Sequence, residues 1–308
     1  MRLVVLLNTE GGSVRAACGG ASPGDSIAAL FAARGVDAEV ICVRGGGLAS
    51  AAQAAAIRSD VDGVVAAGGD GTLGTVAGAL AGTDKPMGVL PLGTRNHFAR
   101  DLGIPLALDE AVEQIASGVV RRVDLGEVNG RIFLNNSSIG LYPRIVEARA
   151  GHRWRRRAGK FVAMVRATIR VTRKVPHMRV LLASGAKRIT RTTPFVFVAN
   201  NDYAFSGFDP RRPRLDGGKL ALYLTDRTTR LGLLRLAIRA IRGTLGKRVG
   251  RELETVRLEE VWIDPGKRLV RVSTDGEVRR LVAPLHYRIL KRALPVFAPL
   301  LPPEEALA

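Results

Sequence analysis

Hydrophobic and polar residues alternate in two different ways along this chain. Up to about residue 120, short continuous apolar runs are separated by segments in which apolar side chains recur every three or four positions. Such runs are typical of strands buried on both faces, and the spacing of three or four is typical of helices. The pattern predicts strands at 3–7, 38–43, 61–67 and 87–90, and helices that begin at Ser22 or cover 48–57, 72–81 and 109–117. Regular alternation of strand and helix predicts a parallel sheet with right-handed crossovers.

After about residue 123 the pattern changes to short strands separated by turn signals. Asn129-Gly130 lies between two apolar runs and predicts a tight hairpin. Further strands are expected at 195–199, 219–224, 255–263, 269–273 and 278–282. Two basic stretches with helical spacing interrupt them, at 154–174 and 228–245. The chain is therefore predicted to continue into a second, β-rich domain.

Composition narrows the class of protein and of partner. The 308 residues suffice for two domains, and only Cys18 and Cys42 occur, which excludes a disulfide framework and suits a reducing compartment. No apolar run approaches the roughly 20 residues needed to span a bilayer. The formal net charge of +19 favours partners such as nucleic acid, anionic lipid or phosphorylated substrates. The alternative is that the excess of arginine is a feature of composition alone.

The most informative segment joins an apolar strand to a helix through Gly68-Gly69-Asp70-Gly71-Thr72. Glycines allow the backbone to approach a phosphate closely, and a helix N-terminus attracts anions. Thr72 is expected to cap the helix, and Asp70 to meet Mg²⁺ or to orient a ribose or a phosphate-bound water. A dinucleotide-binding fingerprint also matches formally, but the acid that it needs about 20 residues later is missing. A glycine turn without a ligand is the remaining alternative.

A second loop of small and polar residues follows the next predicted strand. It reads Pro91-Leu92-Gly93-Thr94-Arg95-Asn96 and again leads into a helical pattern. Open α/β sheets bind ligands at the carboxyl ends of neighbouring strands. Both loops are therefore expected to lie at one edge of the sheet and to face one ligand.

These motifs resemble the catalytic family of the diacylglycerol kinases, which includes bacterial soluble lipid kinases and, more distantly, sphingosine and ceramide kinases. The first two matching pieces are the loops at 68–72 and 91–96, and the third is Asp275-Gly276-Glu277. Segments 135–140, 200–203 and 215–220 match more loosely. The resemblance extends from Leu3 to about Leu290. NAD kinases and phosphofructokinases share the first motif, whereas the later motifs favour the lipid kinases.

The resemblance implies a fold of two domains. One is a three-layer α/β nucleotide-binding domain over residues 1–124, to which the segment 284–308 returns. The other is a β-sandwich-like lipid-substrate domain over 125–283. The cofactors implied are ATP and Mg²⁺.

The resemblance also implies roles for single residues. The ATP phosphates would lie on the first loop, close to Thr94 and Asn96 in the second, with Asn8 at the rim of the cleft. Asp275 matches the general base that takes the proton of the lipid hydroxyl. Glu277 matches an acid on the nucleotide or metal side, and in some members of the family the base is assigned there.

Three positions depart from the family pattern. The family has Asn-Pro-x-Ser-Gly after its first strand, whereas this chain has Asn-Thr-Glu-Gly-Gly from Asn8. A threonine expected after the second strand is replaced by Val43 or Arg44. Some bacterial members hold a structural Mg²⁺ with a Leu-Asp-Asp-Gly segment. This chain has Leu-Asp-Gly-Gly there, so Gly217 replaces the second acid. Asp216 is thus left as a weak candidate ligand.

The expected partner is a diacylglycerol-like lipid in an anionic membrane surface. The segment 152–179 carries ten Lys and Arg, no acid and interleaved apolar residues, a composition that suits an anionic lipid interface. We therefore expect a cytoplasmic protein, peripherally associated with the inner face of the membrane, with no nucleic acid partner. A homodimer is the oligomer considered. The alternatives are an NAD kinase-like enzyme, although no Asn-Glu pair for ribose is present, and a non-catalytic nucleotide- or lipid-binding regulator.

Overall fold

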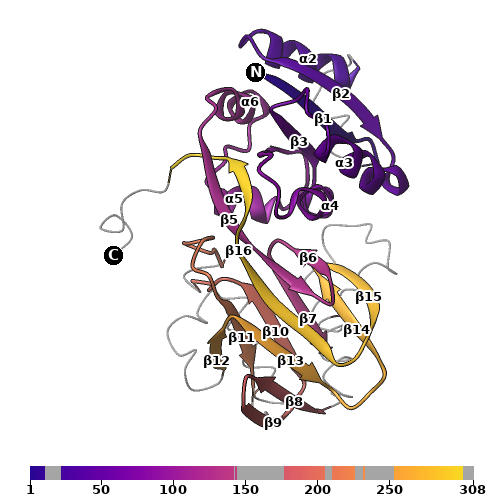
Figure 1. Cartoon of the computed structure of the whole chain (residues 1–308), viewed down its shortest axis with the longest axis vertical. Helices are drawn as coiled ribbons and strands as arrows, with labels where there is room; N and C mark the ends of the chain where they lie inside the picture. The colour runs from indigo at the N-terminus through magenta and orange to yellow at the C-terminus, as the bar shows by residue number, and fades with distance from the viewer. Residues whose placement is uncertain are drawn as a thin grey trace, which may run out of the picture.

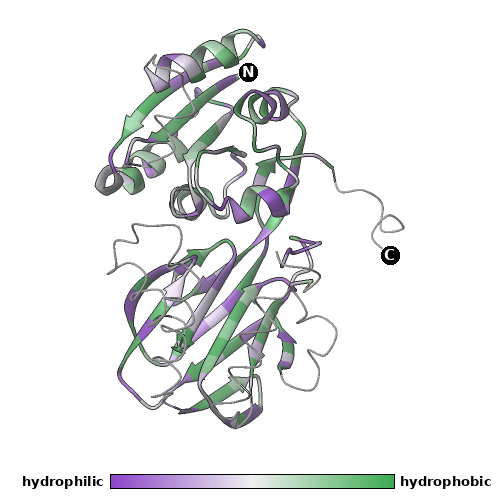
Figure 2. Ribbon diagram, turned by 180° about the vertical axis from the view of Figure 1, so that it is seen from behind, coloured by the Kyte–Doolittle hydropathy of each residue, from purple (hydrophilic) through white to green (hydrophobic). Residues whose placement is uncertain are grey.

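The chain folds into two lobes that are connected by long, continuous strands (Figure 1). The computed structural model describes residues 1–10, 22–141, 143, 177–204, 210–225, 232 and 253–300. The upper lobe in Figure 1 contains all five described α-helices, and the lower lobe is built of strands. Apolar residues follow the strands of both lobes (Figure 2).

Four parallel strands form the centre of the upper lobe, as the sequence predicts. They run in the order β2-β1-β3-β4. Their bounds are β1 Arg2–Asn8, β2 Asp37–Val43, β3 Gly63–Gly68 and β4 Met87–Pro91. The apolar run Leu3–Leu7 is fully buried, which explains why it is continuous.

Helices cover both faces of this sheet. They are α2 Pro23–Ala32, α3 Leu48–Ala56, α4 Asp70–Leu80, α5 His97–Leu102 and α6 Leu108–Ala116, with a short 3₁₀ turn at Gly45–Gly47. Strand β2 lies on one side of β1, and β3 and β4 lie on its other side. Right-handed crossovers then set α2 on one face and α3 and α4 on the opposite face. The contacts agree, because α2 touches α6 and α3 touches α4. The predicted α/β domain with three layers is confirmed.

The lower lobe consists of two facing layers of antiparallel strands. One layer has the order β12-β11-β10-β7-β14-β15. Its strands are β7 Asn136–Gly140, β10 Phe195–Asn200, β11 Leu220–Leu224, β12 Glu254–Leu258, β14 Leu269–Thr274 and β15 Glu277–Val282. The other layer contains β8 Met178–Ser184, β9 Lys187–Thr193, β13 Glu260–Asp264, the hairpin β5 Val120–Val128 and β6 Arg131–Phe133, and part of β16 Leu285–Phe297. Buried residues from both layers form one core, so the predicted β-sandwich-like domain is confirmed.

The strand expected over 255–263 is the main error of element assignment. The chain leaves one layer after Leu258 and enters the other at Glu260, so the predicted strand is divided between β12 and β13. The Asn129-Gly130 turn is correctly predicted, since both residues have positive φ angles, 47° and 77°. Strands β7, β8, β9 and β16 are not among those that the sequence predicts.

Strand β16 connects the two lobes. It pairs with β13 at one end and, through Val296, with Met87 of β4 at the other. The boundary at residue 124 falls inside β5, which also runs alongside β16, so the exact division into domains stays a prediction. Among the described residues no helix is long and apolar enough to span a membrane. The basic stretches at 154–174 and 228–245, apart from position 232, lie outside the described residues.

Candidate active site between the lobes

The first glycine loop is short and tightly packed. β3 ends at Gly68 and α4 begins at Asp70, with Gly69 as the N-cap residue. A Cβ atom on Gly68 would lie 2.5 Å from Thr72 Oγ1, so only glycine fits there without displacing the threonine. The expectation that Thr72 caps the helix is wrong, because the helix starts two residues earlier. The first-turn N–H groups of α4, which have no partner inside a helix, lie at the carboxyl end of the sheet.

The second loop packs directly on the first. A Cβ atom on Gly93 would lie 2.5 Å from the Cα of Gly69, so the two loops approach through their glycines. Asn96 has a φ of 50°, and its side chain fixes the loop. Its Nδ2 donates to the carbonyls of Pro91 and Gly93, both at 2.9 Å, and its Oδ1 accepts the N–H of Gly93 at 3.0 Å. Asn96 therefore shapes the loop, whereas Thr94 is exposed and accessible to a ligand.

Two further side chains tie the loops to their surroundings. Asn8, at the end of β1, donates from Nδ2 to Thr72 Oγ1 at 2.9 Å. The carboxylate of Asp70 accepts the N–H groups of His97 at 3.4 Å and Phe98 at 3.2 Å, at the start of α5. Asp70 thus joins the two loops. Its expected contact with ATP-bound Mg²⁺ stays a prediction.

The opposite wall of the site comes from the lower lobe. Asp275 and Gly276 form the turn of the β14–β15 hairpin, with φ angles of 48° and 89°. The Asp275 carboxylate accepts three backbone N–H groups, from Leu134 at 2.7 Å, Asn135 at 2.8 Å and Asn136 at 3.1 Å. Burial raises the pKa of this carboxyl, although the three N–H bonds and the charge of Arg212 act in the opposite direction. The carboxyl group is therefore held in one orientation.

The two walls meet at the first turns of α4. A Cβ atom on Gly74 would lie 3.6 Å from Asp275 Oδ2, and one on Gly71 would lie 3.1 Å from Glu277 Oε1. Glu277 is exposed and forms an ion pair with Arg279 at 3.1 Å. The glycines of α4 leave room for both acids. The structure therefore brings the residues predicted at the two loops together with the predicted pair of acids.

A buried arginine, which no sequence motif marks, connects the two walls. Arg212 Nε donates to Asp101 Oδ2 at 2.8 Å, and the two side chains are 0% and 5% exposed. Its guanidinium also donates to the carbonyl of Leu134 at 2.6 Å and to Asn135 Oδ1 at 2.6 Å. Asp101 lies in α5, directly after the second loop, while Leu134 and Asn135 hold Asp275. Arg212 therefore links the second loop to the backbone segment that holds the Asp275 carboxylate.

A buried aspartate strengthens the junction of the lobes. Asp124 of β5 is 1% exposed, and its carboxylate accepts the N–H of Arg292 at 2.7 Å, the N–H of Gly218 at 2.7 Å and Asn201 Nδ2 at 3.1 Å. An acid between Val123 and Leu125, inside an apolar strand, was the signal that could have identified it. Its carboxylate thereby satisfies a backbone N–H group of the turn that contains Gly218.

The weak metal site at Asp216 does not fit a structural Mg²⁺. The Asp216 carboxylate pairs with Arg214, with 3.2 Å between Oδ1 and Nε. A Cβ atom on Gly217 would lie 2.8 Å from Asn201 Oδ1, so a second acid has no room unless Asn201 moves. In the described part of the chain, no group of three or more His, Cys, Asp or Glu side chains could hold a metal ion. We assign no role to a structural metal here.

Comparisons with known proteins find relatives of the part of the chain that carries both glycine loops. Residues 2–128 match the model of the diacylglycerol kinase catalytic domain, a range that contains both glycine loops. A diacylglycerol kinase of Bacillus subtilis (strain 168) is 47% identical over 88 residues, which is 28% of this chain and 29% of that protein. A YegS-like lipid kinase of Pseudomonas syringae pv. tomato is 49% identical over 79 residues, 25% of this chain and 26% of that protein. The matched segments thus span less than a third of these curated relatives.

Solved structures extend the likeness to the whole chain. A protein of Bacillus anthracis str. Sterne that is named as a diacylglycerol kinase has a TM-score of 0.66 and 20% identity, covering 97% of this chain and 96% of its own. A second structure from that strain, provisionally named in the same way, has a TM-score of 0.73 and 21% identity, covering 97% and 95%. At this identity the likeness establishes the fold. Residues 2–128 are thus similar to the diacylglycerol kinase catalytic domain, and the chain as a whole has the two-lobed fold of these bacterial proteins.

Proposed function

We propose that this protein is an ATP-dependent lipid kinase, which transfers the γ-phosphate of ATP to the hydroxyl of a diacylglycerol-like lipid at a membrane surface. One observation supports this most directly. The acids of the β14–β15 hairpin lie against Gly71 and Gly74, in the helix that follows the first glycine loop, inside the matched domain. A donor phosphate on the loop and an acceptor hydroxyl at Asp275 would therefore share one crevice.

The upper lobe would bind the nucleotide. The N-terminus of α4 and the backbone of both loops offer N–H groups to the phosphates, and Asn96 keeps the second loop in the required shape. Mg²⁺ enters with ATP as part of the substrate and neutralises charge on the phosphates. Asp70, which joins the two loops, and Glu277, beside Gly71, are the acids that would face this ion.

The lower lobe would activate the acceptor. Asp275 Oδ1 accepts two N–H groups and Oδ2 only one, so Oδ2 retains capacity for a further hydrogen bond. This is also the oxygen that lies beside Gly74. A raised pKa makes the carboxylate a stronger base for the proton of a lipid hydroxyl. General base catalysis of this kind typically contributes ~10²–10⁴-fold to the rate.

Several observations support a lipid as the acceptor and a peripheral association with the inner face of the membrane. The curated relatives are named diacylglycerol kinase and lipid kinase. The net charge of +19 attracts an anionic surface, where each Lys or Arg contributes about 1 kcal/mol. A diglyceride stays in the bilayer, so the enzyme has to bind at its surface.

Product identification tests the proposal. The purified protein is incubated with ATP labelled at the γ-phosphate, Mg²⁺ and vesicles made from a bacterial lipid extract. We expect the label in a phosphorylated lipid that is extracted into organic solvent. Transfer of the label to NAD would instead identify an NAD kinase-like enzyme, and ATP binding without any transfer would identify a regulator. Either of these results would overturn the proposal.

A further inference from the structure

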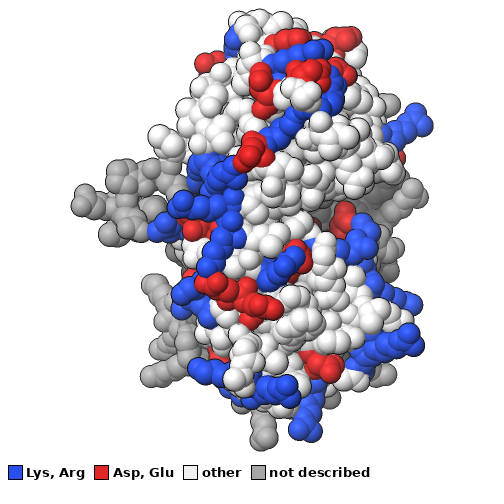
Figure 3. All heavy atoms as spheres, in the orientation of Figure 1, with Lys and Arg blue, Asp and Glu red and all other residues white. Residues whose placement is uncertain are grey.

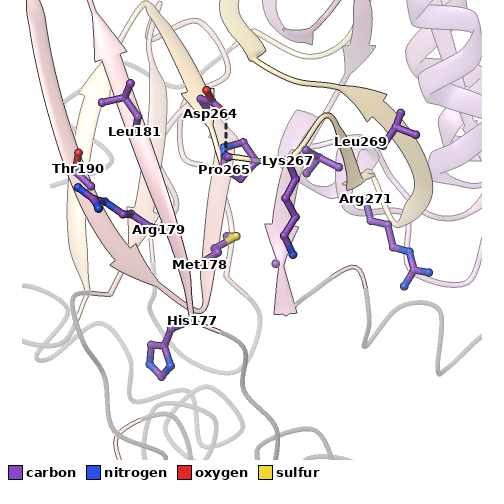
Figure 4. Close-up of a pocket in the computed structure, with 13 residues that line it drawn as sticks. His177, Met178, Arg179, Leu181, Thr190, Asp264, Pro265, Lys267, Leu269 and Arg271 are labelled. Atoms are coloured by element: carbon purple, nitrogen blue, oxygen red, sulfur yellow. Dashed lines mark hydrogen bonds between the residues drawn. The ribbon is translucent and has the colours of Figure 1, made fainter.

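A cavity of the lower lobe is lined by residues outside the site between the lobes. Figure 4 shows this cavity in close-up. Its volume is about 900 Å³, within the range of about 300–1,000 Å³ that is typical of small-molecule sites. It opens between the β8–β9 hairpin on one side and β14, with the turn that precedes it, on the other. The C-terminal end of β7, at Gly140, completes it.

The cavity combines an apolar interior with a basic rim. Pro265 and Val270 are buried and Met178 is half-buried, so these three form the interior. The rim is exposed and carries two leucines and three cations, namely Leu181, Leu269, Arg179, Lys267 and Arg271. Figure 4 shows Met178 and Lys267 directed into the space between β8 and β14. The surface therefore suits a ligand with an apolar chain and an anionic head.

The acid of the cavity does not cancel this charge. Asp264 is the acid among the described lining residues, and its Oδ1 accepts the N–H of Gly266 at 2.8 Å, so it stabilises the turn (Figure 4). The next strands add more positive charge, since Arg271 on β14 lies directly opposite Arg280 on β15. Basic side chains also line this edge of the lower lobe in Figure 3.

The cavity is distinct from the candidate active site. Val270 lies in the cavity and Asp275 follows five residues later along β14, which corresponds to about 17 Å of extended strand. β7 runs alongside over the same interval, from Asn136 beside Asp275 to Gly140 in the cavity. The two sites therefore lie at opposite ends of one pair of strands.

We infer that this cavity binds one molecule of an anionic phospholipid from the bilayer. An acyl chain would occupy the interior, and the phosphate would lie among Arg179, Lys267 and Arg271. The exposed leucines, Leu181 at 38% and Leu269 at 57%, would contact the membrane next to the bound lipid. This site would anchor the lower lobe to an anionic surface. It goes beyond the proposed kinase activity and does not require phosphate transfer.

Calorimetric titration of the full chain tests the inference. The probe is 1-oleoyl lysophosphatidate below its micellar concentration, compared with inorganic phosphate and with monooleoylglycerol. We expect lysophosphatidate to bind at least roughly tenfold more tightly than either, because only it supplies both chain and phosphate. An excess of dihexanoylglycerol, a soluble diglyceride, should not displace it. Equal binding of free phosphate, or displacement by the diglyceride, would overturn the assignment.

Matched variants locate the binding in the cavity. Leu181→Asp and Lys267→Glu should each weaken the binding of lysophosphatidate about tenfold or more. The first change places a carboxylate at the mouth of the cavity, and the second reverses a charge on its rim. The controls are Ile189→Asp, 43% exposed on the neighbouring strand, and Arg268→Glu, the residue next to Lys267. Neither control residue lines the cavity, so each should change the affinity less than twofold. Equal effects of test and control variants would also contradict the inference.

Discussion

Replacement of Arg212 by methionine should destabilise the protein far more than the loss of an ordinary ion pair. The arginine and Asp101 have side chains that are 0% and 5% exposed, so the variant would leave a carboxylate buried without its counter-charge. Breaking a buried pair in this way typically costs 3–5 kcal/mol, about a third of the stability of an ordinary domain or more. The carbonyl of Leu134 would lose one donor, but Asn200 Nδ2 still bonds it at 2.9 Å.

The surface pair of Arg257 and Asp202 provides the matched control. Its distance, 2.7 Å between Nε and Oδ2, is similar to that of the buried pair, but its side chains are 57% and 43% exposed. Exposed pairs contribute about 0–1 kcal/mol. Urea denaturation, followed by circular dichroism, gives the free energy of unfolding for Arg212→Met, Arg257→Met and the wild type. The double variant Asp101→Leu/Arg212→Met should lose less free energy of unfolding than the two single variants together, because it buries no unpaired charge.

An equal loss in the free energy of unfolding for Arg212→Met and Arg257→Met would refute this reasoning. So would strict additivity of the changes at Asp101 and Arg212. A functional readout separates positioning from simple stability. Without the arginine, the pKa of Asp275 should rise further, since the charge of Arg212 lowers it. The acid limb of the pH–activity profile should therefore move to higher pH in the fraction that remains folded.

Four further predictions concern the site between the lobes. Gly93→Ala should abolish nucleotide binding measured by calorimetry, because its Cβ would meet Gly69 Cα at 2.5 Å, whereas Gly46→Ala, with no atom within 4 Å, should bind normally. Glu277→Gln should raise KM for MgATP more than it lowers kcat, and a loss of kcat as large as that of an Asp275 variant would instead identify Glu277 as the base. Since the pKa of Asp275 is raised in the folded state, wild-type activity should fall with acidification above the pH at which an ordinary aspartate titrates. By linkage, this carboxyl's contribution to stability should be greatest below its unfolded-state pKa and should decrease as pH rises through its folded-state pKa.

The sequence predicts the upper lobe well because its signals are local. Leu3–Leu7 is apolar throughout because both faces of β1 are covered, and the glycine run at 68–71 marks the tight passage from strand to helix. The hairpin at Asn129-Gly130 is also encoded locally, by the need for two positive φ angles. The families that these motifs resemble then suggest the nucleotide site.

The rest depends on contacts between residues far apart in the chain. Asp101 and Arg212 are 111 residues apart, and Arg212 lies among other arginines with no local feature that sets it apart. The sequence of β12 and β13 predicts one continuous strand, because the change of layer at Glu259 carries no turn signal. Asp275 could be predicted as a turn residue or as a base, and the structure shows a position that permits both. The turn geometry and the carboxylate's contact with α4 occur together.

The Asp275→Asn variant tests the central claim most directly. Asparagine tolerates the φ of 48°, and its amide oxygen can still accept the N–H groups of Asn135 and Asn136. Calorimetry should therefore show MgATP affinity within about threefold of the wild type, while transfer of labelled phosphate to diglyceride vesicles falls by ~10²–10⁴-fold. Near-normal transfer by this variant, or loss of ATP binding together with transfer in a folded protein, would contradict the account.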